Sequence, residues 1–145
     1  MRSKVVSSIG TLGLFFVLAI AGVHAQTATR GEVNLPFDFT AGSAALKAGQ
    51  YSIKKMNGNV ISFRTEDGSK RVLVDAPLVV GARASKAGAR LVFNRYGDVY
   101  FLSQVWLNAD TGRQVFPSKA ESQARNAQLA RGIKPERIEV VLQGN

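Results

Sequence analysis

The sequence predicts a mainly β protein: a single-domain antiparallel β-sandwich or small barrel of about seven or eight strands, with one short helix near the C-terminus. Two observations lead to this class. Short segments rich in Val, Ile and Phe, several with apolar side chains at every second position, recur along the chain, and clusters of Gly, Asn, Asp and Ser separate them. Only one late segment has helical spacing, and the chain shows no internal repeat and no sign of a second domain.

Residues 1–25 are predicted to be a secretory signal peptide. Arg2 and Lys4 form a basic start, residues 9–23 are an uncharged apolar run, and a small residue stands at each of the two positions that signal peptidase recognises before cleavage after Ala25. The run has about 15 residues, fewer than the roughly 20 of a membrane-spanning helix. Cleavage is therefore favoured over an uncleaved anchor. The rest of the chain is expected to be exported, periplasmic or extracellular, with no transmembrane anchor.

The mature chain, residues 26–145, is expected to form the β domain and to start with a flexible leader, residues 26–31. A strand follows, because apolar side chains stand at every second position of VNLPFDFTAG: Val33, Leu35, Phe37 and Phe39. Pro36 has no amide donor, so this strand is expected at the edge of a sheet or broken at that point.

Hairpins are predicted in the middle of the chain. Asn57-Gly58 is the strongest short hairpin signal, because both residues tolerate positive φ. Residues 79–89 start as a strand and continue as an exposed, Gly-rich and basic loop. The other elements predicted here are a turn at 47–49, strands at 50–56 and 59–65, a turn at 66–69 and a strand at 71–78.

Residues 90–95 and 99–107 flank Tyr96-Gly97-Asp98 and predict a further hairpin, followed by a turn at 108–113. Strict alternation would place Val99, Phe101, Ser103, Val105 and Leu107 on one face of its second strand, and Tyr100, Leu102, Gln104 and Trp106 on the other. Both sets are largely apolar. This strand is therefore expected in the middle of a sheet that is covered on both sides.

The same hairpin carries the candidate ligand-binding residues: Arg95, Tyr96, Asp98, Tyr100, Gln104 and Trp106. Aromatic faces stack on sugars or bases, and Arg and Asp provide directional hydrogen bonds. The alternative is that the aromatic residues belong to the core and bind nothing, and both interpretations stay open at this point.

The predicted helix covers residues 118–131. Ser118, with Glu121 three residues later, is a capping-box pattern, and Glu121 is placed to pair with Arg125 one turn further on. Gly132 is a natural stop. Residues 132–145 form a tail or a last strand, for which RIEVVL, residues 137–142, is the candidate.

Four segments, LPFDFTAG, LKAGQY, LVFNRYGDVYFLSQVW and SKAES, are similar to a family of small exported proteins of unknown function from soil-dwelling bacteria. The resemblance runs from about Leu35 to Ala124 and implies export and a small β domain, and it implies no activity. Two positions differ from the family's usual pattern. Lys47 stands where Pro is usual, and Asn94 stands where His is usual, so a role that rests on that histidine would be lost here.

Composition excludes several classes of enzyme. The chain has no cysteine, and its single histidine, His24, would leave with the signal peptide. A Cys nucleophile, a Ser-His-Asp triad and a zinc site of His and Cys ligands are therefore excluded in the mature chain. P-loop, GxGxxG and EF-hand spacings do not occur in the sequence. We expect no cofactor, no metal site and no enzymatic activity.

The charge favours an anionic partner. Without Arg2 and Lys4, 17 Lys and Arg stand against 10 Asp and Glu, a net charge of +7. Such a charge favours lipopolysaccharide phosphates, acidic glycans or extracellular DNA, bound without sequence-specific recognition of nucleic acid. In the Gly-rich loop the polyanion-binding candidates are Arg83, Lys86 and Arg90; further candidates are Lys54, Lys55, Lys70 and Arg71. The alternative is that these are ordinary solubilising charges along hairpin edges.

The expected function is a non-enzymatic binding or structural protein of the cell envelope, with anionic glycans or other polyanions as partners. One alternative is a lipocalin-like carrier of a small apolar ligand. A second is a glycan hydrolase with two carboxylates about 5–10 Å apart. Its candidate acids are Asp38, Asp75, Asp98 and Glu121, and nothing in their sequence spacing brings two of them together. The sequence does not indicate an oligomeric state.

Overall fold

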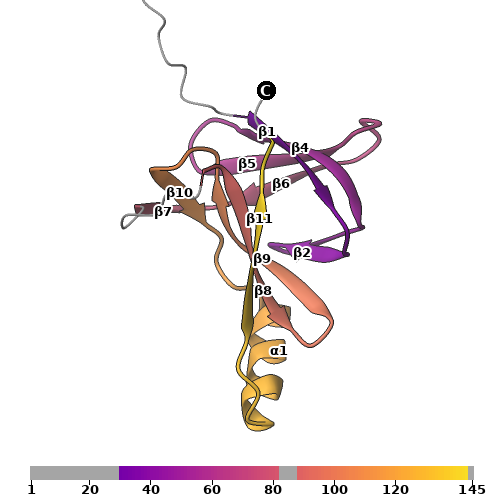
Figure 1. Cartoon of the computed structure of the whole chain (residues 1–145), viewed down its shortest axis with the longest axis vertical. Helices are drawn as coiled ribbons and strands as arrows, with labels where there is room; N and C mark the ends of the chain where they lie inside the picture. The colour runs from indigo at the N-terminus through magenta and orange to yellow at the C-terminus, as the bar shows by residue number, and fades with distance from the viewer. Residues whose placement is uncertain (1–29, 82–87, 144–145) are drawn as a thin grey trace, which may run out of the picture.

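The computed structural model describes residues 30–81 and 88–143, which form eleven strands and one helix arranged in two sheets (Figure 1). The protein is mainly β, as predicted, and the two sheets form a β-sandwich. The predicted signal peptide lies outside the described residues. In the described ranges, no helix has the length and apolar character needed to cross a membrane.

The first sheet contains four antiparallel strands in the order β1-β4-β5-β6. Their bounds are Arg30–Leu35 for β1, Gly49–Lys55 for β4, Val60–Thr65 for β5 and Arg71–Asp75 for β6. Alternate side chains of each strand are buried against the second sheet, among them Val33, Ile53, Phe63 and Val74. The other side chains, mostly polar or charged, lie on the outer face.

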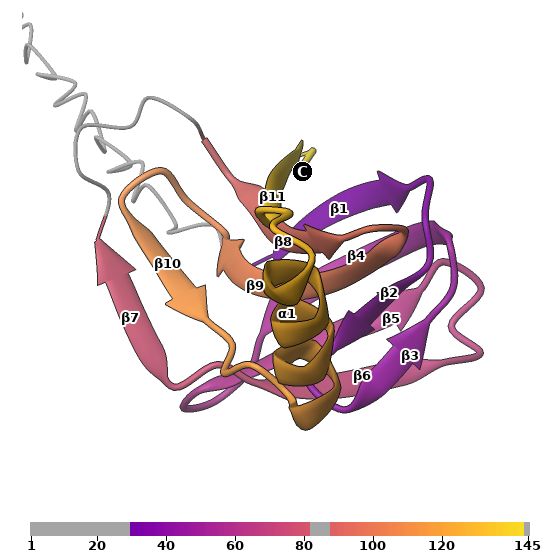
Figure 2. The same ribbon diagram turned by 90° about the horizontal axis from the view of Figure 1, so that it is seen from below.

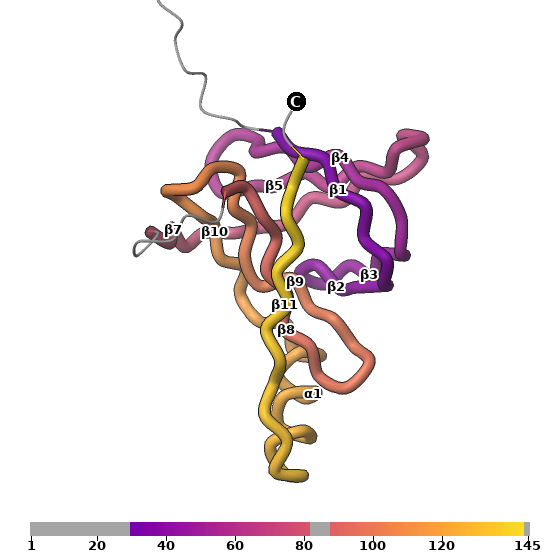
Figure 3. Tube along the Cα trace, viewed as in Figure 1, coloured from indigo at the N-terminus to yellow at the C-terminus, as the bar shows by residue number. Residues whose placement is uncertain are grey.

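The second sheet has the order β11-β8-β9-β10-β7, with β2 paired in parallel to β9 and β3 paired to β2. The bounds are Phe39–Ala41 for β2, Ala44–Leu46 for β3, Leu78–Gly81 for β7, Arg90–Tyr96 for β8, Val99–Trp106 for β9, Thr111–Gln114 for β10 and Glu136–Val141 for β11. In the tube drawing β11 runs along β8 and returns to the start of β1 (Figure 3). There the backbones of Glu32 and Gln143 exchange hydrogen bonds of 3.0 and 2.8 Å, which join the two sheets at one edge.

A single hydrophobic core lies between the sheets. The ring of Phe39 is at its centre, with centroids 5.6 Å from Tyr51, 6.2 Å from Phe63 and 5.5 Å from Phe93. Such aromatic pairs add to the large apolar area that each ring removes from water.

Pro36 acts as predicted. β1 ends at Leu35, β2 begins at Phe39, and β1 is an edge strand of its sheet. The predicted leader is too long, because Arg30 and Gly31 already pair with β4. The hairpin at Asn57-Gly58 is confirmed, with Gly58 at φ 67° between β4 and β5.

Two boundaries are wrong and account for β7 and β10 as separate strands, while β3 is a further strand that was not predicted. Residues 71–78 are not one strand: Ala76 is fully buried, its amide donates to the Asn59 carbonyl at 2.9 Å, and Pro77 has no amide to continue the ladder. The chain therefore crosses from β6 in the first sheet to β7 in the second. The turn predicted at 108–113 is shorter, because Asn108 Oδ1 accepts from the amides of residues 110 and 111 and β10 starts there.

The alternation predicted for β9 is wrong after Leu102. Phe93 pairs with Leu102 but Val92 pairs with Gln104, so Ser103 is an extra, bulged residue. Leu102 and Val105 consequently both face the core, together with Leu107, while Phe101, Gln104 and Trp106 lie on the outer face. The prediction that this strand is central and buried on both sides is confirmed.

The predicted helix is confirmed as α1, Lys119–Ala130, with Ser118 Oγ accepting from the Glu121 amide at 3.1 Å. Gly132, at φ 71°, follows its end. Viewed from below, α1 lies in front of β8 and β9 (Figure 2). The predicted pairing of Glu121 with Arg125 is wrong, because the carboxylate of Glu121 is turned inward instead and only 4% of the residue is exposed. The last strand predicted at 137–142 is β11.

Candidate functional site

The six predicted ligand-binding residues do not share one surface. Arg95, Asp98 and Tyr100 gather at the tip of the β8–β9 hairpin. Tyr96 lies under α1. Gln104 and Trp106 lie further along the outer face of the second sheet, because of the bulge at Ser103.

Arg95 is occupied by contacts with the hairpin tip and with Glu136, the first residue of β11. Its guanidinium lies 3.4 Å from a carboxylate oxygen of Glu136, 3.8 Å from that of Asp98, and 5.5 Å from the ring centroid of Tyr100. The ring of Tyr100 in turn stacks on Phe37, with centroids 3.9 Å apart. These contacts fix the conformation of the tip. They account for the positions of the Arg95 and Tyr100 side chains without a bound ligand.

Tyr96 belongs to a buried polar cluster beneath the first turn of α1. Glu121 Oε1 accepts from Asn94 Nδ2 at 2.9 Å and from the Tyr96 hydroxyl at 3.2 Å. Burial first, and then the nearby Glu121 carboxylate, raise the pKa of Tyr96 above its usual value. The hydroxyl therefore stays protonated and donates, which anchors the helix to the sheet.

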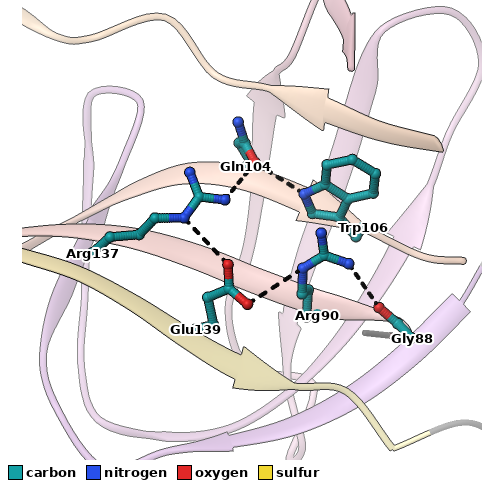
Figure 4. A network of polar contacts seen from close by, with 6 residues as sticks. All are labelled: Gly88, Arg90, Gln104, Trp106, Arg137 and Glu139. Atoms are coloured by element: carbon teal, nitrogen blue, oxygen red, sulfur yellow. Dashed lines mark hydrogen bonds and ion pairs between the residues drawn. The ribbon is translucent and has the colours of Figure 1, made fainter. Parts of the chain in front are cut away.

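Gln104 and Trp106 are part of a polar network with Arg90 (Figure 4). The Arg90 guanidinium lies 4.2 Å from the Trp106 ring and 3.6 Å from Glu139, and it donates to the Gly88 carbonyl at 3.1 Å. The side chain of Gln104 accepts from the Trp106 indole at 3.0 Å and from Arg137 at 3.3 Å.

This network changes the expectation for Arg90. Arg90 is not in the exposed loop: it is the first residue of β8 and only 5% of it is exposed. A buried guanidinium that lies over an indole and beside a carboxylate is a structural cation. The other two predicted loop cations, Arg83 and Lys86, lie outside the described residues.

The acids considered for a hydrolase lie on different elements. Of these acids, Asp38 and Asp98 line one open hollow. Asp38 accepts from the Ala48 amide at 2.8 Å and from Lys47 Nζ at 3.0 Å, and these hydrogen bonds lower the pKa of its carboxyl. Because a glycosidase needs one carboxyl whose pKa is raised, this arrangement does not favour hydrolysis. Phe39, Leu46 and Val99 also line this hollow, which has a volume of about 340 Å³.

A cluster of four cations lies elsewhere, on the outer face of the first sheet. Each of its four strands contributes one cation to a hollow of about 200 Å³, which we call the basic hollow. These cations are Arg30 on β1, Lys54 on β4, Arg64 on β5 and Arg71 on β6. Ser52 and Ser62 also line it, and no carboxylate does.

Strand register places the four cations in two facing pairs. Arg30 is directly opposite Lys54, and Arg64 is directly opposite Arg71. Across the described ranges, no carboxylate forms an ion pair with Lys54, Arg64 or Arg71, whereas Arg30 lies 3.6 Å from Glu32. Like charges that face each other across a ladder destabilise a sheet.

The turn between β5 and β6 sets the register that places Arg64 opposite Arg71. Asp67 Oδ1 accepts from the Thr65 hydroxyl at 2.6 Å, from the Ser69 amide at 3.0 Å and from the Ser69 hydroxyl at 2.8 Å. These hydrogen bonds lower the pKa of Asp67 to about 2. Gly68, at φ 71°, completes the turn, and a side chain there would meet the Arg64 guanidinium.

Sequence reasoning named Lys54 and Arg71 among scattered cations and missed Arg30 and Arg64. The turn signal at residues 66–69 contained the necessary information, because a tight turn there places Arg64 opposite Arg71. The pairing of β1 with β4, which adds Arg30, has no comparable local signal, because more than ten residues, including β2 and β3, separate these strands.

No known family model, no curated protein and no solved structure matches the chain. A site at the basic hollow is therefore inferred from the geometry of this structure alone.

Proposed function

We propose that the protein is an exported, non-enzymatic protein of the cell envelope that binds anionic polymers through the basic hollow. The observation that carries this proposal is the facing of Arg64 and Arg71 across β5 and β6, with no carboxylate between them in the described part of the chain. A sheet gains nothing in stability from such a pair. An anion bound between the two guanidinium groups would replace their repulsion by two attractions.

The chemistry of the basic hollow suits phosphate or carboxylate groups. Arginine offers a planar set of N–H donors that matches both groups in a bidentate way. Lys54 adds a point charge, and the hydroxyls of Ser52 and Ser62 add short-range donors. Ser52 is partly exposed, whereas Ser62 is only 4% exposed and lies at the floor of the hollow.

Binding through these groups would depend on salt. Each cation that neutralises a polymer charge releases a counterion, so affinity falls with ionic strength. The overall excess of basic residues would add long-range attraction, which also weakens with salt.

The test measures binding of purified mature protein to lipopolysaccharide, an acidic polysaccharide and duplex DNA across a salt series. We expect binding that falls steeply with salt, and a loss of roughly tenfold or more in the double variant Arg64→Glu/Arg71→Glu. The matched control is Lys119→Glu/Arg131→Glu at the ends of α1, which changes net charge equally and leaves the first sheet intact.

Equal losses in the two double variants would show that only net charge matters and would overturn the site. Salt-insensitive binding, or no binding to any of the three polymers, would overturn the function. Urea unfolding of both variants verifies that they are folded under the assay conditions.

A further inference from the structure

We infer that the ligand of the basic hollow is an acidic glycan in which charged and neutral sugars alternate, and that a polymer charged at every unit is a poor ligand. This inference rests on the proposed function and specifies its substrate class. It comes from a second hollow that continues the first.

The second hollow, of about 310 Å³, shares three lining residues with the basic hollow: Arg30, Ser52 and Arg64. The other residues that line the second hollow differ in charge from those of the basic hollow. Glu32 and Glu66 both face it, together with the amide of Gln50. The two hollows thus form one groove on the outer face of the first sheet, with a cationic half and a half that contains carboxylates.

The carboxylates are positioned by the fold. Glu32 is paired with Ser52 in the β1–β4 ladder, and its side chain lies 3.6 Å from the Arg30 guanidinium, at the boundary between the halves. Glu66 follows β5, and its amide donates to the Gln50 carbonyl at 3.1 Å, which fixes the start of the turn beside β4.

This separation of charge selects among anionic polymers. A polymer with a charge on every unit, such as polyphosphate or a chain of uronic acids, would place one anion in the basic hollow and the next against Glu32 and Glu66. Like-charge contact of this kind costs binding energy and excludes wrong partners. A neutral sugar instead presents hydroxyl groups, which donate to carboxylates and exchange hydrogen bonds with an amide such as Gln50.

The groove has room for neighbouring sugar units. Its two halves follow each other along β4, with Gln50 in one and Lys54 in the other, and residues rise about 3.3 Å along a strand, so these two positions are on the order of 13 Å apart. A ligand that lies along it would have its charged sugar at Lys54 and Arg71 and its neutral sugar at Gln50.

The experiment compares two tetrasaccharides by titration calorimetry at one salt concentration. One is a hyaluronan fragment, with a carboxylate on every second sugar, and the other is a tetragalacturonide, with a carboxylate on every sugar. Inorganic polyphosphate is the third ligand. We expect the wild-type protein to bind the hyaluronan fragment most tightly, although it carries the fewest charges.

The variants Glu32→Gln and Glu66→Gln test the cause. Each should raise affinity for the tetragalacturonide and for polyphosphate by about two- to fivefold, and leave affinity for the hyaluronan fragment unchanged or lower. Asp110→Asn, an equal change of charge at a turn of the second sheet, should alter none of these affinities by more than about twofold.

A wild-type preference for the fully charged ligands that the Glu variants do not change would overturn the inference and leave the proposed function standing. Failure of all three ligands to bind, with no effect of Arg64→Glu/Arg71→Glu on any envelope polymer, would overturn both.

Discussion

The side-chain amide of Asn94 donates a 2.9 Å hydrogen bond to the buried carboxylate of Glu121, 27 residues further along the chain. This bond joins β8 to the first turn of α1.

Replacing Asn94 by alanine should therefore destabilise the protein without touching the basic hollow. A buried carboxylate that loses a donor costs about 1–3 kcal/mol in the free energy of unfolding. Urea unfolding followed by circular dichroism measures this loss. Asn34→Ala, at an exposed position of β1, is the control and should cost less than about 0.5 kcal/mol. Similar losses in the two variants would contradict the role given to Asn94.

Asp67→Asn should weaken the β5–β6 turn in a way that depends on pH. The folded-state pKa of Asp67, about 2, lies below the value of 3.8 expected for the unfolded chain. The stability that the Asp67 carboxylate contributes to the fold is therefore fully present above about pH 4 and is lost as the pH falls through 2. We expect the variant to melt below the wild type at pH 7 and the gap to narrow towards pH 2. Ser69→Ala, which removes one donor to Asp67, should have a smaller effect at pH 7. A difference in melting temperature that stays constant from pH 7 to pH 2 would contradict the role given to the Asp67 carboxylate.

Gly112→Ala should disturb the packing around Trp106. Gly112 is directly opposite Trp106 in the β9–β10 ladder, and a Cβ atom there would lie 2.5 Å from the indole ring. Overpacking of this kind costs about 1–3 kcal/mol. Because Trp106 is the only tryptophan, its fluorescence reports both the local change and unfolding. Gly81→Ala, on the neighbouring β7 with open space around the added Cβ, should leave stability nearly unchanged. If Gly112→Ala leaves both the fluorescence spectrum and the unfolding midpoint unchanged, the Trp106 ring can move away from the added methyl group.

The single substitution Arg64→Glu should make the folded protein more stable and weaken its binding to an acidic polymer. It replaces a like-charge pair with an opposite-charge pair across from Arg71, which favours the folded state by about 0.2–1 kcal/mol. The same change removes a cation from the basic hollow, so binding to an acidic polymer should fall. The two measurements are a urea midpoint and a binding titration on the same sample. A variant that is both less stable and weaker in binding would point to damage to the sheet, and one with unchanged binding would remove Arg64 from the site.

Much of the fold could be predicted from the sequence, because the signals involved are local. Asn57-Gly58 and the turn at Gly97 mark hairpins through backbone conformations that only a few residues tolerate. Ser118 marks the start of α1 because its hydroxyl satisfies an amide three residues away. Pro36 marks a strand end because it lacks a donor. The bulge at Ser103 carries no such signal, and one extra residue there was enough to move Trp106 and Gln104 away from the face predicted for them.

The candidate site was only partly accessible from the sequence. An excess of basic residues was plain in the composition, and it determined the class of partner to consider. Which cations act together was decided by the order β1-β4-β5-β6 and its register, which place Arg30, Lys54, Arg64 and Arg71 around one hollow. Conversely, Arg90, a predicted surface cation, is buried against Trp106.

The sequence by itself thus determined most of the strands and turns, the helix and the sign of the charge, because these follow from side-chain period, backbone conformation and composition within a few residues. Only the tertiary structure decided which strands are neighbours, which face each side chain occupies and which charges meet. Those are properties of pairings between segments that are distant along the chain, and their free energy depends on the whole sheet and its core.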